Sequence, residues 1–419
     1  MTVHSASPPA LGRGLGAYRQ SLRGVSRNCW LVFLAGSLAG LAQGVFAVDF
    51  NLYILELGIA PDTLGGILSA APFAQALASI PISMLSEVLG FKAAFILIFG
   101  VSGLAKVGQL VTTSVPLIAA ASFVDGLAMA GGFVVRLPFL AANTEPRAQT
   151  QVYSINSMLF SVSMSLGSLL ASQVPNVLEG VMGDLAGAYR ATLLGAAVLT
   201  LVAVIPIFAL RPTPPTGLRP LALRDYLWRV DRFVIYQAAI TLFVGLSIGV
   251  VGPFMNLIFL YHLGATREFY GAVSALALIP AVLGAAAVPA LATRAGSIVS
   301  KVTWLRLAVP FCLIGMAMTA NPWLGTVGFW GQNTLVFMAA PLAFAFAMEV
   351  ARDTRPVLSA WLNVTFWIGS AVAAPLTGLL IAEDRYGATL VLAAAFSVGA
   401  ALLNQVWLAP IERAARERS

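Results

Sequence analysis

The chain has 419 residues, of which 59% are hydrophobic and only 10% are charged, and its mean hydropathy is +0.88. A soluble protein of this length could not bury so much apolar surface in a core, so the composition excludes an ordinary water-soluble fold. The formal net charge of +7 needs no nucleic-acid partner, because basic residues also gather on the cytoplasmic face of membrane proteins.

A membrane-spanning helix needs roughly 20 predominantly apolar residues, and the chain holds twelve such runs. The predicted spans of the first half are 29–57, 64–89, 92–114, 115–142, 150–174 and 188–211. Those of the second half are 232–263, 268–293, 299–320, 322–351, 356–382 and 387–411. We therefore predict an all-α polytopic membrane protein with two pseudo-symmetric six-helix halves, 29–211 and 232–411.

The segments between and around these halves carry most of the basic residues. A proline- and arginine-rich linker is predicted over 212–231, with tails at 1–28 and 412–419. If both termini are cytoplasmic, only Arg190, Arg267 and Arg385 fall in outer segments, as the positive-inside rule requires. We expect a multi-pass protein of the cell membrane, surrounded by the lipid bilayer, with both termini in the cytoplasm.

The two halves share an internal repeat. Residues 50–55 read Phe-Asn-Leu-Tyr-Ile-Leu, and about 206 positions later residues 255–260 read Met-Asn-Leu-Ile-Phe-Leu. Glycines follow each segment at matching positions: Gly58, Gly65 and Gly90, then Gly264, Gly271 and Gly296. About 208 positions separate 145–147, Glu-Pro-Arg, from 353–355, Asp-Thr-Arg. Two related six-helix halves are typical of a transporter whose substrate site lies between them.

The loop between the second and third spans carries a partial family signature. The full pattern is a glycine, three residues, an acid, a base, any residue, a glycine and two bases. The chain keeps the acid Glu87, the second glycine Gly90 and the final base Lys92; the equivalent later loop keeps Arg294 and Gly296. Together with the twelve spans, the repeat and the linker, this motif resembles the major facilitator superfamily of secondary transporters along nearly the whole chain.

The resemblance implies a cytoplasmic latch. Glu87 would pair with Arg352 or Arg355 when the inner gate is shut, and Arg294 would face Glu145, because ion pairs at helix ends can form in one state and break in the other. The expected gate residues are Glu87, Gly90, Lys92, Glu145, Arg147, Arg294, Gly296, Asp353 and Arg355. The alternative is that these charges are solvated loop residues that only set the topology.

Charges within the spans point to a coupling site, because each costs at least about 2.5–3.5 kcal/mol at the bilayer centre. Lys106 lies eight residues before the predicted turn at Ser114, and Asp125 lies eleven residues after it, so the two could pair. Asp49 lies at similar depth, and the resemblance makes Asp49 and Asp125 cavity acids. We expect proton exchange through Asp49 or Asp125, modulated by Lys106. A static Lys106–Asp125 salt bridge is the alternative.

The second half is poorer in predicted buried charge and offers mainly amides and aromatic rings. Such groups can bind a polar solute or hold a ring or a cation, although amides in membrane helices often only bond a neighbouring helix. Arg136 would suit an anion or a gate. The substrate-cavity candidates are Arg136, Asn51, Gln237, Asn256, Asn333, Asn363 and Trp367.

These features favour a secondary active transporter of a small solute that works by alternating access with proton coupling, and export of an amphipathic compound is the first interpretation. Uptake of a sugar-like or carboxylate nutrient is the alternative, and a non-transporting assembly factor or sensor on the same fold is a third.

An enzyme is not expected. The chain has only two histidines, His4 and His262, without metal-ligand spacing, and it has no phosphate-binding glycine loop with lysine. We expect no cofactor and no metal, partners limited to the substrate and protons, and a monomer, the default of the resembled family.

Overall fold

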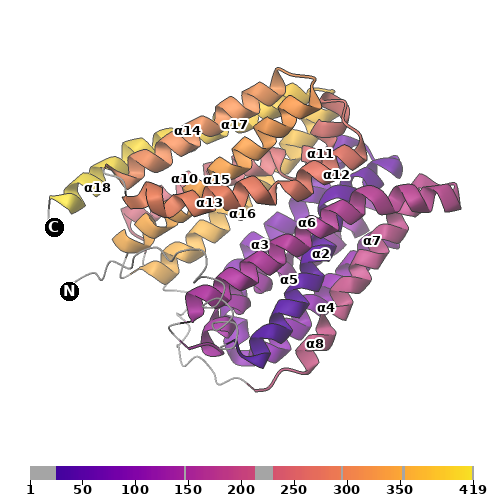
Figure 1. Cartoon of the computed structure of the whole chain (residues 1–419), viewed down its shortest axis with the longest axis horizontal. Helices are drawn as coiled ribbons and strands as arrows, with labels where there is room; N and C mark the ends of the chain where they lie inside the picture. The colour runs from indigo at the N-terminus through magenta and orange to yellow at the C-terminus, as the bar shows by residue number, and fades with distance from the viewer. Residues whose placement is uncertain (1–24, 146–147, 213–229, 294–295, 352–353, 418–419) are drawn as a thin grey trace, which may run out of the picture.

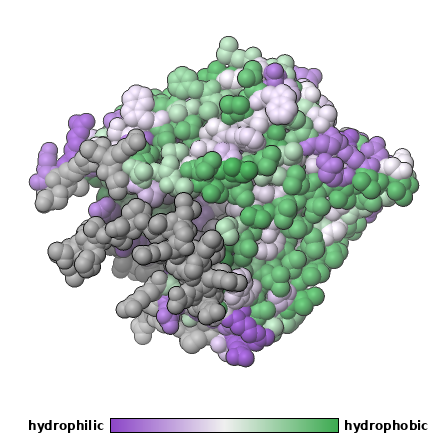
Figure 2. Space-filling model, viewed as in Figure 1, coloured by the Kyte–Doolittle hydropathy of each residue, from purple (hydrophilic) through white to green (hydrophobic). Residues whose placement is uncertain are grey.

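The computed structural model describes residues 25–145, 148–212, 230–293, 296–351 and 354–417. Every element assigned within these ranges is a helix, and twelve of the helices there are long and apolar enough to cross a membrane. Each coincides with a predicted span, which confirms the predicted fold class. Figure 2 shows apolar residues over most of the visible surface, with hydrophilic residues gathered near the ends of the helices.

The N-terminal half comprises α2 to α8. Its helices are α2 (Arg27–Glu56), α3 (Pro61–Leu89), α4 (Phe91–Leu110), α5 (Val115–Ala142), α6 (Gln149–Met182), α7 (Leu185–Val202) and the short α8 (Val204–Phe208). The fifth span is longer than predicted, because α6 continues through Pro175 and ends only at Gly183. The φ of +68° at Gly183 and its N–H bond to the Glu179 carbonyl form a left-handed helix cap that glycine adopts without strain.

The C-terminal half comprises α10 to α18. Its elements are α10 (Arg232–Val251), α11 (Met255–Leu257), a π-helical turn (Ile258–His262), α12 (Arg267–Leu276), α13 (Leu278–Thr293), α14 (Ile298–Ala317), α15 (Pro322–Val350), α16 (Arg355–Ala382), α17 (Tyr386–Leu403), a second π-helical turn (Asn404–Leu408) and α18 (Ala409–Arg416). The seventh span is broken after Val251, because Pro253 has no N–H to continue the helix ladder.

The repeat seen in the sequence is also present in the backbone. Gly58 and Gly264, 206 positions apart, have φ of +76° and +63°, and each follows the first helical span of its half. Gly90 and Gly296, also 206 positions apart, have φ of +76° and +114° and precede the third span of each half. A side chain strains the backbone at such φ values, so both halves use glycine at the same two turns.

The helix ends define two ends of the molecule. The terminal end holds the start of α2, the short α8, the turns at Gly90 and Gly296, and α18. The distal end holds the turns near Gly58, Gly183 and Gly264 (Figure 1). The ribbons of the two halves meet toward the distal end and diverge toward the terminal end. Accordingly, α6 packs along α12, which forms the distal part of the eighth span. It barely contacts α13, which continues that span toward the terminal end.

Two helix crossings hold the halves together, and they are related by the repeat. At one crossing Gly65 of α3 lies against Ala374 and Gly378 of α16. At the other Gly271 of α12 lies against Ser168 and Ser172 of α6. Ala374 and Gly378 follow Ser168 and Ser172 by 206 positions, as Gly271 follows Gly65. Small residues allow this close approach of two helices, so the distal closure is pseudo-two-fold symmetric.

Candidate functional site

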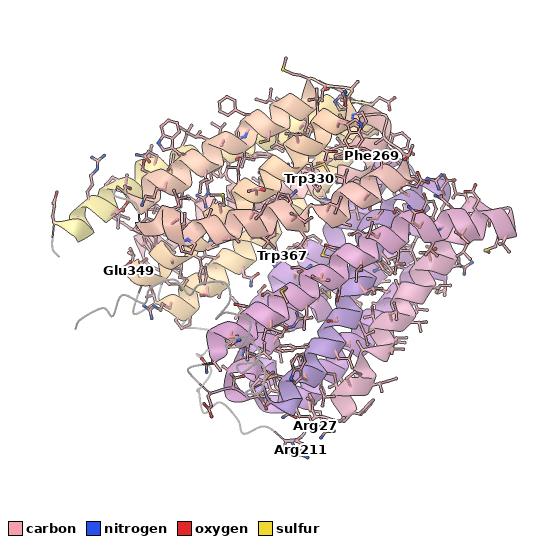
Figure 3. All side chains as sticks on the ribbon, viewed as in Figure 1. Arg27, Arg211, Phe269, Trp330, Glu349 and Trp367 are labelled. Atoms are coloured by element: carbon pink, nitrogen blue, oxygen red, sulfur yellow. The ribbon has the colours of Figure 1, made fainter. Side chains whose placement is uncertain are left out.

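A cavity of about 370 Å³ lies between the two halves. From the N-terminal half it is lined by Gln43, Phe46, Ala47, Phe50, Asn51, Ile67, Leu68, Ala71, Lys106, Gln109, Ser122 and Asp125. From the C-terminal half it is lined by Ile248, Gly252, Pro253, Phe366, Trp367 and Ser370. Trp367 is seen where the two halves meet in Figure 3. The lining combines aromatic rings with amides, hydroxyls and one ion pair, which suits a solute with both apolar and polar parts. We call this space the central cavity.

The ion pair joins α4 to α5. The Lys106 ammonium donates to Asp125 Oδ2 and, at 3.3 Å, to Ser102 Oγ, one turn earlier on α4. The Ser102 hydroxyl donates to Asp125 Oδ1 at 2.5 Å. Lys106 is only 2% exposed, and its Nζ lies 5.1 Å from the centroid of the Phe46 ring. Each charge thus has an opposite charge and a hydroxyl as partners, which makes a buried pair tolerable in a medium of low dielectric constant.

Asp49 lies on α2 outside the central cavity. Its side chain is 1% exposed, and Oδ2 has no hydrogen-bond partner among the described residues. Arg267, at the start of α12 in the other half, lies near enough for its positive charge to act on Asp49. The Arg267 guanidinium carbon also lies 5.4 Å from the centroid of the Tyr189 ring. A buried acid of one half is therefore coupled electrostatically to a cation of the other.

Asn51 and Asn256 join the halves beside the cavity. Asn51 Nδ2 donates to the Pro253 carbonyl and, at 3.3 Å, to Asn256 Oδ1. Asn256 Nδ2 donates to the Val48 carbonyl at 2.8 Å. Pro253 and Asn256 follow Val48 and Asn51 by 205 positions, so the two amide-to-carbonyl bonds are equivalent under the repeat. We call this pair the asparagine clasp.

The other predicted cavity residues are spread over both halves. Arg136 lies on α5 with its guanidinium carbon 5.4 Å from the Phe160 ring centroid, and its Nε has no hydrogen-bond partner among the described residues. Asn333 of α15 donates to the Phe329 carbonyl of its own helix at 2.8 Å. Gln237 is buried on α10, and Asn363 is partly buried on α16. Of the predicted set, Asn51 and Trp367 line the central cavity.

The predicted gate residues that the structure describes lie at the terminal end. Lys92 donates to the Phe208 carbonyl at 2.6 Å, and Arg355 Nε donates to the Met348 carbonyl at 2.8 Å, so each of these two bonds stays within one half. Glu145 is exposed. Arg147, Arg294, Arg352 and Asp353 lie outside the described residues, as does the side chain of Glu87. The latch therefore stays a prediction.

Several lining residues were not predicted from the sequence. On α2 the positions 43, 46, 47, 50 and 51 line the cavity, with the three- and four-residue spacing of one helix face. This stripe of Gln, Phe, Ala, Phe and Asn is a signal that could have marked the cavity face of the first span. Gln109 and Ser122 each lie three residues from a member of the ion pair. Arg306 on α14, a further intramembrane cation, was also missed.

Comparison with known proteins finds a similarity to one family. Residues 32–234 match the family model described as Major Facilitator Superfamily. A search of curated proteins found no match. Solved structures, in contrast, resemble the chain over nearly its whole length.

The nucleoside transporter NupG is 12% identical, with a TM-score of 0.71 over 90% of this chain and 98% of that one. A bacterial homologue of the human lysosomal transporter Spinster, in an inward-facing and occupied conformation, is 13% identical, with a TM-score of 0.74 over 92% and 96%. A D-xylose–proton symporter is 13% identical, with a TM-score of 0.70 over 93% and 98%. At these identities the likeness is one of fold. The chain is thus similar to the Major Facilitator Superfamily by the model match over residues 32–234, and it shares its fold with solved transporters over nearly its whole length.

Proposed function

We propose that this protein is a secondary active transporter that moves a small amphipathic solute by alternating access and couples the movement to protons. The observation that carries the proposal is the buried Lys106–Asp125 pair in the wall of a cavity between two pseudo-symmetric halves. An ion pair inside a membrane domain is a functional hypothesis by default, because it is expensive to maintain there. An enzymatic activity does not fit this fold and its transporter relatives.

Alternating access is supported by where the halves touch. The asparagine clasp and both glycine crossings lie toward the distal end, whereas the ribbons diverge at the terminal end (Figure 1). With the terminal end in the cytoplasm, as the positive-inside rule predicts, this arrangement supports an inward-facing state of the transporter. Rocking of the halves would separate the crossings and close the terminal end around the same cavity.

Proton coupling is assigned to the ion pair. A proton that reaches Asp125 removes its charge and frees the Lys106 ammonium, which then lies in the cavity wall without its partner. A solute that contacts Lys106 or Ser122 therefore changes how readily Asp125 takes up a proton. Solute binding and proton binding therefore influence each other through Lys106, Ser122 and Asp125, which is the requirement for coupling.

Export is the proposed direction, because Phe46, Phe50, Phe366 and Trp367 line the cavity beside the polar groups. Such a lining binds compounds that also partition into the membrane. The nucleoside and D-xylose transporters of the same fold carry polar solutes, so the experiment must sample both kinds of compound.

The test uses everted membrane vesicles with a pH-sensitive dye and an imposed proton gradient. A panel of lipophilic cations, sugars, nucleosides and carboxylates is added to vesicles that contain wild type, Asp125→Asn or Asp384→Asn. Asp384 is an exposed residue with φ of +55°, which asparagine tolerates, so it is the matched control. We expect at least one compound to discharge the gradient with wild type and Asp384→Asn only. Discharge that is equal with Asp125→Asn would exclude Asp125 as the coupling group.

A further inference from the structure

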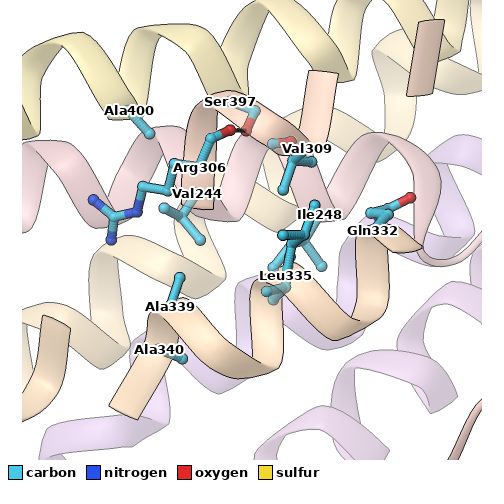
Figure 4. Close-up of a pocket in the computed structure, with 12 residues that line it drawn as sticks. Val244, Ile248, Arg306, Val309, Gln332, Leu335, Ala339, Ala340, Ser397 and Ala400 are labelled. Carbon is cyan, nitrogen blue, oxygen red and sulfur yellow. Dashed lines mark hydrogen bonds between the residues drawn. The ribbon is translucent and has the colours of Figure 1, made fainter. Parts of the chain in front are cut away.

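A second, smaller cavity of about 70 Å³ lies within the C-terminal half (Figure 4). Its walls come from α10, α14, α15 and α17, and its polar lining residues are Ser247, Arg306, Gln332 and Ser397. Ile248 of α10 lines both this cavity and the central cavity, so the two spaces are neighbours. We call it the arginine pocket.

Arg306 lines this pocket, with its guanidinium on the side opposite Gln332 in Figure 4, and it is a cation without an acid. It lies eight residues into α14, about 12 Å along the helix. Its Nη1 donates to Asn404 Oδ1 at 3.1 Å, and among the described residues no carboxylate lies within ion-pair distance of it. Asn404 is held in place, because its Nδ2 donates to the Val299 carbonyl at 3.1 Å and to Thr303 Oγ1 at 2.9 Å. The neutral amide thus orients the guanidinium but leaves its charge uncompensated.

The pocket holds one more polar group without a partner. Gln332 of α15 is 8% exposed, and its Oε1 has no hydrogen-bond partner among the described residues. Ser397 donates to the Arg306 carbonyl at 3.1 Å, and Ser247 donates to the Ala393 carbonyl at 2.8 Å. The serine hydroxyls are therefore engaged with backbone, whereas the guanidinium remains available.

The N-terminal half supplies a comparison. There the cation Lys106 lies on α4, and the neighbouring helix α5 provides the acid Asp125. The counterparts of these helices in the repeat are α14 and α15. An offset of 206 to 208 positions places residues 331–333, Gly-Gln-Asn, opposite Asp125, and none of these is acidic. The C-terminal half thus has a partly buried cation on α14 and no acid at the α15 positions that correspond to Asp125.

We infer that Arg306 binds an anionic group, a carboxylate or phosphate, of the transported solute, whose apolar body lies in the central cavity against Phe366 and Trp367. This inference rests on the proposed transport function and adds the charge of the solute. An isolated guanidinium inside a membrane domain is unfavourable, and a carboxylate or phosphate restores charge balance through paired hydrogen bonds. The pocket is large enough for such a group but not for a whole solute, since only about 70 Å³ is free.

The test measures binding to the purified full-length protein in phosphatidylcholine nanodiscs. The probes are inorganic phosphate, octanoate and 1-naphthoate, with octanamide and 1-naphthamide as neutral analogues; the readouts are equilibrium dialysis and the shift of the melting temperature. The variants are Arg306→Gln, Arg306→Lys and, as a control that removes an exposed charge of the same half, Arg413→Gln. Melting without ligand checks that each variant is folded.

We expect at least one anionic probe to bind wild type and Arg413→Gln, with its amide about tenfold weaker or more, since a charged hydrogen-bonded pair is lost. Arg306→Gln should lose this preference for the anion, and Arg306→Lys should keep part of it. Equal binding of acid and amide, equal binding by Arg306→Gln and Arg413→Gln, or no binding of any anionic probe would each overturn the inference.

A second set of nanodiscs, made with phosphatidylglycerol, distinguishes a solute from a lipid as the source of the anion. Carboxylate binding that persists there supports a solute. Binding that disappears there, with Arg306-dependent stabilisation by the lipid, would overturn the assignment to the solute in favour of a lipid headgroup. Because these assays measure binding alone, their failure is distinct from failure of the vesicle experiment, which tests transport with neutral and cationic compounds as well.

Discussion

Lys106 and Asp125 illustrate, at the scale of single residues, how this protein places charge in a membrane. The carboxylate receives both the ammonium and the Ser102 hydroxyl, and Lys106 is almost fully buried. The attraction offsets the desolvation of both groups only while both are present. Removal of either partner therefore leaves an uncompensated charge.

This argument predicts a non-additive effect on stability. Lys106→Met alone should lower the free energy of unfolding by about 3–5 kcal/mol, because Asp125 remains buried without its cation. The double variant Lys106→Met/Asp125→Leu should recover most of that loss, since two apolar groups of similar size replace the pair. Equilibrium unfolding in mixed micelles measures each variant. A double variant as unstable as the sum of the two single variants would contradict the prediction.

The helix crossings decide, at the scale of elements, which end of the molecule is closed. α3 and α16 approach so closely at Gly65 that an added Cβ would lie 2.6 Å from the Ala374 carbonyl oxygen. The neighbouring Gly66 has nothing within 4 Å of the same hypothetical atom. Two adjacent glycines on one helix thus face very different surroundings.

Gly65→Leu should therefore prevent close packing of α3 on α16 and shift the protein toward a state open at the distal end. The matched control Gly66→Leu should leave the conformation unchanged, because its side chain has free space. A cysteine in place of Ser370, which lines the central cavity, reports the shift through labelling by a membrane-impermeant thiol reagent from the distal side. Equal labelling rates in both backgrounds would show that this crossing does not control access.

The asparagine clasp acts at the scale of the whole molecule, because it joins the halves by bonds that the repeat makes equivalent. Each amide reaches a backbone carbonyl of the other half, and the Pro253 carbonyl lies where α10 is broken. The break that ends α10 therefore lies beside the Pro253 carbonyl, which accepts the Asn51 bond of the clasp.

The symmetry of the clasp predicts that Asn51→Ala and Asn256→Ala have similar effects. Each should weaken the distal closure by about 1 kcal/mol, the usual size of an interhelical hydrogen bond in a membrane. The double variant should lose more than either single variant but less than their sum, because the two residues share the Asn51–Asn256 bond. Spin labels at the exposed distal residues Thr113 and Ala320, without Cys29 and Cys312, report the separation of the halves. Asn333→Ala is the control, because the side-chain bond of Asn333 among the described residues goes to the Phe329 carbonyl of its own helix at 2.8 Å. Strongly unequal single effects would contradict a shared clasp.

Much of the fold could be predicted because its signals are local. The twelve apolar runs and the glycines repeated in the two halves can be recognised within short stretches of sequence. In the structure Gly58, Gly90, Gly264 and Gly296 adopt positive φ. The break after Val251 was missed, although Pro253 gives a local reason for it. The predicted end of the fifth span at residue 174 was wrong, because α6 continues through Pro175. A long membrane helix can do so when neighbouring groups satisfy the hydrogen bonds of its backbone.

The order of the residues alone predicts twelve helices long and apolar enough to cross a membrane, in two related halves, with Lys106 and Asp125 at compatible depths. Which faces of these helices meet depends on their packing in three dimensions. A helix that is apolar all round carries little record of its orientation, so Asp49 and Asp125 looked alike, whereas packing places Asp125 in the central cavity and Asp49 outside it. The uncompensated charge of Arg306 likewise emerges only when the neighbours on α15 and α17 are known, because neutralisation depends on distances between helices and not on order along the chain.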